Sequence, residues 1–202
     1  MISQFSANSL RCLYDFKGYP KSAILRVFTA LLLSMAGILL SQTITAEAVT
    51  NSYYGSGYFP TNNLNRCHTG GHSTQAQNAS AAWSSSTDLN MYYSCSGTHI
   101  TTNNSDFGST GWAGYGNVCD VNSQCALSGG NPWNSTFASC EALLNQYSFD
   151  NNPGYYTNAV IETLATHELG HCYSLDHATN TSVMNASSTI QTQDINLINA
   201  RY

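Results

Sequence analysis

Positive charge is scarce in this sequence, and after residue 48 it contains no lysine at all. The whole chain has 6 Lys+Arg against 11 Asp+Glu, and from Val49 onward only Arg66 and Arg201 are basic. Nucleic acids and anionic membranes are both bound through basic patches. The charge balance therefore argues against either of them as a partner.

Cysteine pairs at metal-binding spacing are missing as well. No C-x-x-C pair occurs in the chain, which argues against a structural zinc cluster built from cysteines. Cys12 belongs to the amino-terminal leader described below, and the six other cysteines are Cys67, Cys95, Cys119, Cys125, Cys140 and Cys172. An even number in an exported chain predicts up to three disulfides, whose pairing the sequence leaves open. Cys119 and Cys125 bracket a short loop and are candidates for one pair.

The first 48 residues have the layout of a secretory signal peptide. Basic residues between Arg11 and Arg26 precede an apolar run from Val27 to Leu40, and a small-x-small pattern ends at Ala48. The apolar run is short for a membrane span. We therefore predict a signal peptide over residues 1–48 and a secreted protein without stable membrane association. An uncleaved amino-terminal anchor is the alternative, because the basic leader is unusually long.

Residues 49–202 show no internal repeat and no interdomain linker, and about 150 residues are enough for one modest core. After an extended arm, the periodicity of apolar residues predicts an α+β domain. The expected strands cover residues 63–67, 88–95, 99–102, 111–118 and 137–147. The expected helices cover residues 74–86, 158–173 and 192–202.

Polar residues mark the expected starts of these helices. Thr74 and Gln77 have the spacing of a capping box, Asn158 is the expected N-cap of the second helix, and Thr192 is that of the third. One face of the second helix is expected to pack on a core through Ile161, Ala165, Leu169 and Cys172.

The second helix also contains residues typical of a catalytic metal site. His167 and His171 are four positions apart and so lie one helical turn from each other, where both rings can bind one ion. After Tyr173 the chain must turn if His177 is to reach the same ion. Three imidazoles leave Zn²⁺ a fourth position for water, whose pKa the metal lowers. Glu168 is then placed to act as the catalytic general base.

This pattern resembles that of the metzincin zinc proteases, and within them the matrixin type. The residues that carry the resemblance are His167, Glu168, His171, Ser174, His177 and Met184. Further likenesses lie at residues 82–84, 144–145 and 193–195. The resemblance implies a zincin-like fold, with a twisted mixed five-stranded sheet, three helices and a zinc cleft. It also implies a Met-turn at Met184 under the metal, and cleavage of proteins bound extended along a sheet edge.

The sequence departs from the matrixin pattern at three points. Ser174 stands where the family usually has Gly, and a left-handed backbone there costs a non-Gly residue roughly 1 kcal/mol. No segment resembles the long pro-domain of the matrixins. Cys67, which follows Arg66, is expected to form a disulfide, and a Cys67 thiolate that binds the zinc is the weaker alternative. The loop with the family's structural zinc and calcium ligands is not recognisable, so Ca²⁺ is possible but has no assigned site.

We therefore predict that residues 49–202 form the catalytic domain of a secreted, monomeric zinc metalloendopeptidase. It is expected to act on protein or peptide substrates, as matrixins do in the extracellular matrix. An exported binding or adhesion module that keeps the zinc site for structure is the alternative function. His68 and His72 are four residues apart, but the glycines between them favour a solvated pair in a loop over a second metal site.

Overall fold

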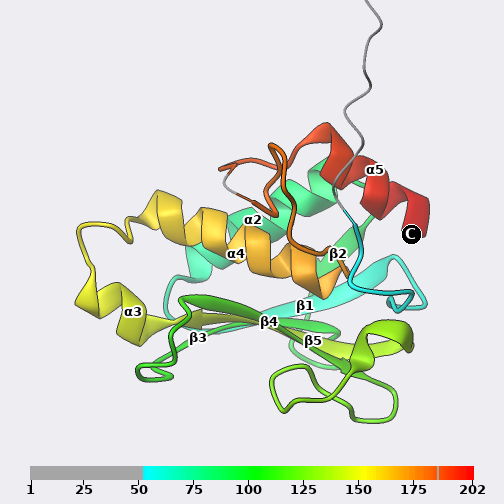
Figure 1. Cartoon of the computed structure of the whole chain (residues 1–202), viewed down its shortest axis with the longest axis horizontal. Helices are drawn as coiled ribbons and strands as arrows, with labels where there is room; N and C mark the ends of the chain where they lie inside the picture. Colours follow the sequence, from blue (N-terminus) through cyan, green and yellow to red (C-terminus); the bar gives the residue numbers. More distant parts are fainter. Residues whose placement is uncertain (1–51, 186) are drawn as a thin grey trace, which may run out of the picture. The chain divides into compact units, whose positions relative to one another are not determined.

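The computed structural model describes residues 52–185 and 187–202, and the predicted signal peptide (residues 1–48) lies outside them. Within these ranges the chain forms one five-stranded sheet and four α-helices (Figure 1). The elements in chain order are β1 (Asn63–Gly70), α2 (Ser73–Ser86), β2 (Asn90–Tyr93), β3 (Ile100–Ser105), β4 (Gly114–Asp120), the 3-10 helix η1 (Pro132–Asn134), β5 (Phe137–Asn145), α3 (Gln146–Asn151), α4 (Asn158–Cys172) and α5 (Thr192–Arg201). The predicted α+β class is confirmed.

The sheet has the strand order β2-β1-β3-β5-β4. Strands β2, β1, β3 and β5 run parallel, and only β4 is antiparallel to its neighbour β5. The sheet is therefore mixed, as predicted. Strand β4 lies at one edge, where Gly114 pairs with Leu144 and Gly116 with Ala142.

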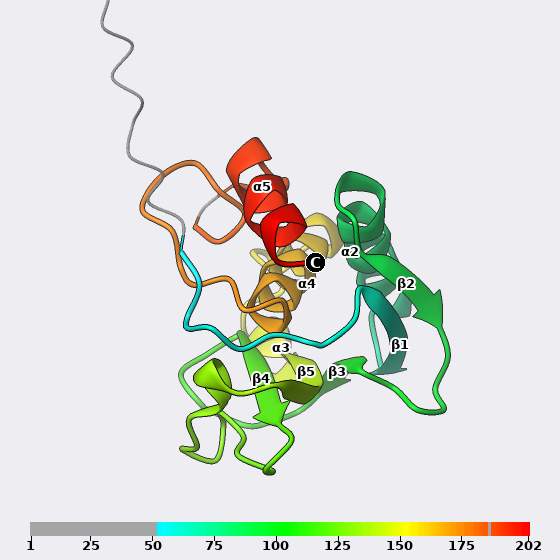
Figure 2. The ribbon, with the colours of Figure 1, turned by 90° about the vertical axis from the view of Figure 1, so that its right-hand side faces the viewer.

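Helices α2 and α4 lie on the same face of the sheet in both ribbon views (Figures 1 and 2). The predicted apolar face of α4 is buried: Ile161 is 2% exposed, and Ala165, Leu169 and Cys172 are fully covered. The indole Nε1–H of Trp83 in α2 donates to the carbonyl oxygen of Thr166 in α4 at 2.9 Å. Helix α4 is thus buried along this face and bonded to α2.

The prediction of three helices was wrong, because the strand expected to reach Tyr147 ends at Asn145 and α3 follows. Asn145 is fully buried and is the N-cap of α3, accepting a hydrogen bond from the backbone N–H of Tyr147 at 3.2 Å. Its amide also donates to the carbonyl oxygens of Gly108 and Trp112. The Asn145 side chain thus caps the helix that begins where β5 ends, and it also bonds to the loop before β4.

The expected helix caps were each displaced. The N-cap of α2 is His72, which has a left-handed backbone conformation (φ 54°) and makes no side-chain cap hydrogen bond. The predicted Thr74–Gln77 capping box therefore does not form. The N-cap of α4 is Thr157 rather than Asn158, because the Thr157 hydroxyl accepts from the N–H of Val160. The N-cap of α5 is Gln191 rather than Thr192.

The strand expected over residues 88–95 is shorter, and its outer part is solvated. Strand β2 covers only Asn90–Tyr93, and the side chains of Tyr92 and Tyr93 are 56% and 58% exposed. It is an edge strand that pairs only with β1. His68 lies within β1 and His72 is the N-cap of α2, so the prediction that both lie in one loop was wrong.

All six described cysteines form disulfides: Cys67–Cys95, Cys119–Cys125 and Cys140–Cys172. The bond from Cys67 to Cys95 excludes the alternative of a Cys67 thiolate on the metal. The Cys140–Cys172 bond connects the middle of β5 to the last residue of α4.

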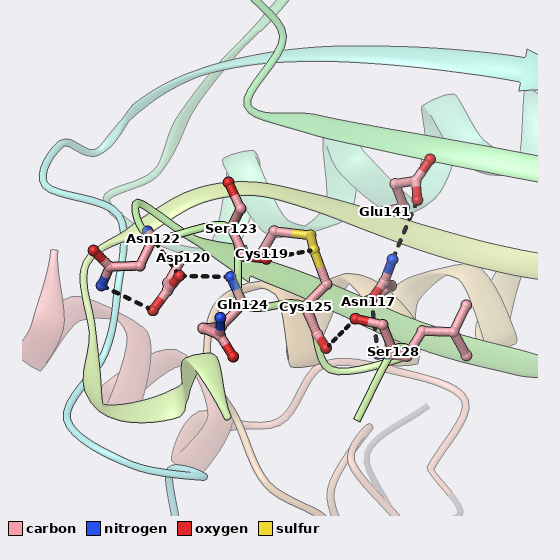
Figure 3. Close-up of a disulfide and its surroundings, with 10 residues drawn as sticks. Asn117, Cys119, Asp120, Asn122, Ser123, Gln124, Cys125, Ser128 and Glu141 are labelled. Atoms are coloured by element: carbon pink, nitrogen blue, oxygen red, sulfur yellow. Dashed lines mark hydrogen bonds between the residues drawn. A yellow bond between two sulfur atoms is a disulfide. The ribbon is translucent and has the colours of Figure 1, made fainter. Parts of the chain in front are cut away.

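The candidate pair Cys119–Cys125 is confirmed and closes the loop at the end of β4 (Figure 3). Within this loop the Asp120 carboxylate accepts from the backbone N–H groups of Asn122 and Gln124, at 2.8 and 2.9 Å. These bonds, chiefly that from Gln124, lower the pKa of Asp120. The loop is thus held by its own polar groups.

Candidate metal centre

Three histidines that the sequence singles out converge on one point. His167 and His171 lie on α4 and His177 follows the turn after that helix, and each ring offers a nitrogen within 4.8 Å of the others. The ring centroids are 4.7 Å apart for His167–His171, 5.2 Å for His167–His177 and 4.7 Å for His171–His177. In the described part of the chain this is the one cluster of His, Cys, Asp or Glu side chains that could hold a metal ion.

Two of the rings are oriented by backbone carbonyl groups. The Nδ1 of His167 lies 2.8 Å from the carbonyl oxygen of Val183, and that of His171 lies 2.8 Å from the carbonyl oxygen of Leu175. A carbonyl oxygen can only accept, so each Nδ1 carries the proton and each Nε2 keeps its lone pair. Burial lowers the pKa of His171 to about 3 and also lowers that of His167. Both are neutral imidazoles, the form that binds metal.

The turn after α4 brings His177 back to the other two histidines. The N–H of Leu175 donates to the carbonyl oxygen of Gly170 at 3.0 Å, and that of Ser174 donates to the carbonyl oxygen of His171 at 2.8 Å. These two bonds form a Schellman motif, which needs a left-handed residue at Ser174. Ser174 indeed has φ 74°, as suspected from its place in the pattern.

The buried Ser174 side chain has a partner that a glycine could not have. Its hydroxyl oxygen accepts a hydrogen bond from Nη1 of Arg201 at 2.7 Å. The same guanidinium group donates to the carbonyl oxygens of Gly55 and Gly57 and lies 3.4 Å from the ring centroid of Tyr53. We call this set, Arg201 with Tyr53, Gly55, Gly57 and Ser174, the arginine brace.

Two substitutions at Ser174 distinguish the effect of its left-handed backbone from that of its hydrogen bond with Arg201. Ser174→Ala should lower the free energy of unfolding by about 2 kcal/mol, because it loses a bond to a charged donor and keeps the left-handed backbone. Ser174→Gly should stay within about 1 kcal/mol of wild type, because relief of strain offsets much of the same loss. Urea unfolding of the metal-free proteins measures both, and equal destabilisation of the two variants would contradict this account.

Met184 packs directly under α4, where the Met-turn was expected. It is fully buried, and its Sδ lies so close to Gly170 that a Cβ atom there would collide with it. The turn is held by Asp194 of α5, whose carboxylate accepts from the Ser182 hydroxyl at 2.5 Å and from the Val183 N–H at 3.1 Å. Helix α5 therefore fixes the same segment whose carbonyl group orients His167.

Glu168 points from α4 toward the edge strand. Its side chain is 4% exposed, and the backbone N–H of Gly116 donates to its carboxylate. A Cβ atom at Gly114 would collide with this carboxylate, and one at Gly116 would collide with His171. Burial raises the pKa of Glu168 to about 8, which gives the carboxylate a high affinity for protons. The two glycines are thus what lets α4 approach β4 so closely.

Two cavities share Glu168 in their lining. The larger, of about 490 Å³, is lined by His167, Glu168, Val160, Leu164, Tyr155 and Tyr156 among others. The smaller, of about 210 Å³, is lined by Tyr54, Tyr115, Trp133, Glu168, His171 and His177 among others. Glu168 thus contributes to the lining of both cavities although its side chain is nearly covered.

Several of these lining residues were not anticipated from the sequence. Gly114 and Gly116 alternate within a strand, and that spacing is a usable sign of close backbone approach. Tyr54 and Trp133 lie in segments without periodicity, where no local signal distinguishes them. His68 and His72 lie apart from the three-histidine cluster.

Residues 137–201 match the sequence model of Peptidase family M54. The matched segment runs from β5 to α5 and includes all three histidines, Glu168 and Met184. No curated protein matches the chain. The matching family is thus a different one from the matrixins that the sequence resembles. Together, the family match and the three-histidine cluster support a metallopeptidase, without supporting the matrixin type in particular.

Proposed function

We propose that this protein is a secreted, zinc-dependent endopeptidase that cleaves internal peptide bonds of protein substrates. The proposal is carried by one observation: three convergent imidazoles accompany the buried carboxyl group of Glu168, which lines two cavities together with them. The match of residues 137–201 supports the metallopeptidase class. Zinc ligation, the role of Glu168 and the choice of protein substrates are our inferences from the site, and secretion is inferred separately below.

His167, His171 and His177 would hold the zinc ion. Three neutral nitrogen donors suit Zn²⁺ and leave a coordination position open, which distinguishes catalytic from structural sites. When bound, zinc supplies Lewis acidity that polarises a substrate carbonyl group and lowers the pKa of water. The carbonyl groups of Val183 and Leu175 hold two of the rings in the orientation this requires.

Glu168 would move the proton during hydrolysis. Its carboxylate takes a proton from the attacking water and delivers it to the amine that leaves. The bond from the Gly116 N–H orients the carboxylate, and the packing of Gly114 against it limits its movement. The surrounding protein keeps bulk water away from the carboxyl group, since only 4% of the residue is exposed.

A peptide substrate would bind in extended form along β4. This strand is at the edge of the sheet, and β5 is its only neighbouring strand. Gln124 and Ala126 bond to the end of β4 at Asp120 and Val118, so a peptide can add through main-chain hydrogen bonds at the start of the strand, near Gly114. The scissile bond would then lie beside Gly114 and Glu168, with an adjacent side chain in the larger cavity. The finer assignment as a matrixin-like enzyme rests on this arrangement and on the Met-turn position of Met184.

Secretion is proposed from the composition of the chain and from its disulfides. Disulfides form and persist in oxidising compartments. The three disulfides of this protein therefore agree with a signal peptide over residues 1–48. Within the described ranges, none of the helices combines the length and the apolar character needed to cross a membrane. We propose that the mature protein acts as a monomer.

Zinc removal tests the proposed activity. Oxidised protein loaded with one equivalent of zinc should cleave casein, and mass spectrometry of the products should show cuts at internal bonds. A chelator should abolish cleavage, and added zinc should restore it, because the three histidines otherwise lack the Lewis acid that polarises the peptide.

The competing function is an exported binding module that uses zinc only for structure. Protein that takes up zinc stoichiometrically, unfolds cooperatively and leaves casein intact after long incubation would favour it over hydrolysis.

A further inference from the structure

His177 is the one histidine of the cluster whose Nδ1 faces a side chain. The other two rings have a backbone carbonyl oxygen 2.8 Å from Nδ1. The Nδ1 of His177 instead lies 3.4 Å from the phenol oxygen of Tyr54. His177 is also the exposed member of the three and comes from a loop rather than from a helix. Main-chain carbonyl groups orient the rings of His167 and His171, so the ring of His177 must be oriented by a different group.

Tyr54 is brought to His177 by the arm that precedes β1. The N–H of Tyr54 donates to the carbonyl oxygen of Ser174 at 3.0 Å, and the N–H of Asp176 donates to that of Ser52 at 2.8 Å. Between them, Tyr53 and Leu175 form an antiparallel bridge. The arm thus pairs, residue by residue, with the segment directly before His177.

The ring of Tyr54 is held by its neighbours on the floor of the smaller cavity. It lies 4.3 Å from the ring of Trp133 and 5.3 Å from that of His171, centroid to centroid. The arginine brace fixes the arm on both sides of this residue, through Tyr53 and through the carbonyl groups of Gly55 and Gly57. The phenol therefore has a fixed place without needing His177 to hold it.

We propose that Tyr54 is a positioning residue for His177, and this inference rests on the proposed metal site. The phenol oxygen accepts a hydrogen bond from the Nδ1–H of His177, so the proton stays on Nδ1 and the Nε2 lone pair is directed at the metal. Outer partners of this kind fix both the tautomer and the ring orientation of a metal-binding histidine. The amino-terminal arm is thereby a functional part of the metal site.

Tyr54→Phe tests the proposal, because it removes only the hydroxyl group and keeps the ring that packs on Trp133 and His171. Zinc affinity, measured by competition with a chromophoric chelator, should fall roughly tenfold. The visible spectrum of the Co²⁺-loaded protein should also change, since it reports the geometry of the ligands. Tyr92→Phe, at a 56% exposed tyrosine of β2, is the matched control and should change neither.

A double-mutant cycle shows whether the effect passes through His177. In a His177→Ala background, Tyr54→Phe should have no further effect on zinc affinity, since interacting residues are not additive. An equal loss in both backgrounds would overturn the proposal and would indicate general destabilisation. Unchanged zinc affinity and an unchanged Co²⁺ spectrum in Tyr54→Phe would overturn the role of Tyr54 and leave the proposed function standing. Wild-type protein that binds no zinc would instead overturn the proposed function, and this inference with it.

Discussion

Glu168→Gln should lower kcat/KM for a protein substrate by roughly 10²–10⁴-fold, the usual contribution of a general acid–base group. The amide keeps nearly the size of the carboxyl group, so its packing against Gly114 should survive. It cannot, however, accept a proton from water near neutral pH. Zinc content should stay at one equivalent, because the three histidines are untouched.

Glu162→Gln is the matched control for this loss. It makes the same chemical change on the same helix, at a residue whose carboxylate contacts Asn78 of α2 at 2.7 Å and lies outside both cavities. Its activity should equal that of wild type. If Glu168→Gln kept full activity with zinc bound, the assignment of Glu168 as the general base would be wrong.

Removal of the Cys140–Cys172 disulfide should cause a large loss of stability. The bond spans 32 residues, and closing a loop of that length contributes about 3–4 kcal/mol through the entropy of the unfolded chain. Both cysteines are buried, at 1% and 0% exposure, so alanines are the appropriate replacements. Cys140→Ala/Cys172→Ala should therefore unfold at markedly lower urea concentration.

The Cys119–Cys125 pair supplies the comparison. It spans only 6 residues, so the same reasoning gives about 2 kcal/mol for its loss. Equal urea midpoints for the two double variants would contradict the loop-length argument. The metal site gives a second readout: Cys172 directly follows His171, so only Cys140→Ala/Cys172→Ala should also weaken zinc binding.

The sequence predicts α4 and the placement of its two histidines well because both depend on the same periodicity. Ile161, Ala165 and Leu169 recur at helical spacing and are buried, and that places His167 and His171 on another side. The position of Ser174 in the pattern also indicated a left-handed residue, which the turn indeed has. These are local properties, set by neighbours within a few turns of one helix.

Features that depend on distant parts of the chain could not be predicted in this way. The end of β5 is decided by the Asn145 side chain, which is bonded to a loop more than thirty residues earlier. Tyr54 reaches His177 across 123 residues, from a segment with no periodic pattern. Both depend on which segments meet in space, and apolar spacing along the chain carries no information about that.

The arginine brace has a consequence for the order in which the protein folds. Arg201 bonds to Gly55 and Gly57 across 146 and 144 residues, the kind of contact that forms late because it closes a long loop. Until α5 docks, the Ser174 hydroxyl and the arm that carries Tyr54 lack the hydrogen bonds of the brace. The third ligand, His177, would then be held less firmly than in the native protein. High-affinity metal capture would accordingly be a late event, coupled to the meeting of two distant ends of the domain.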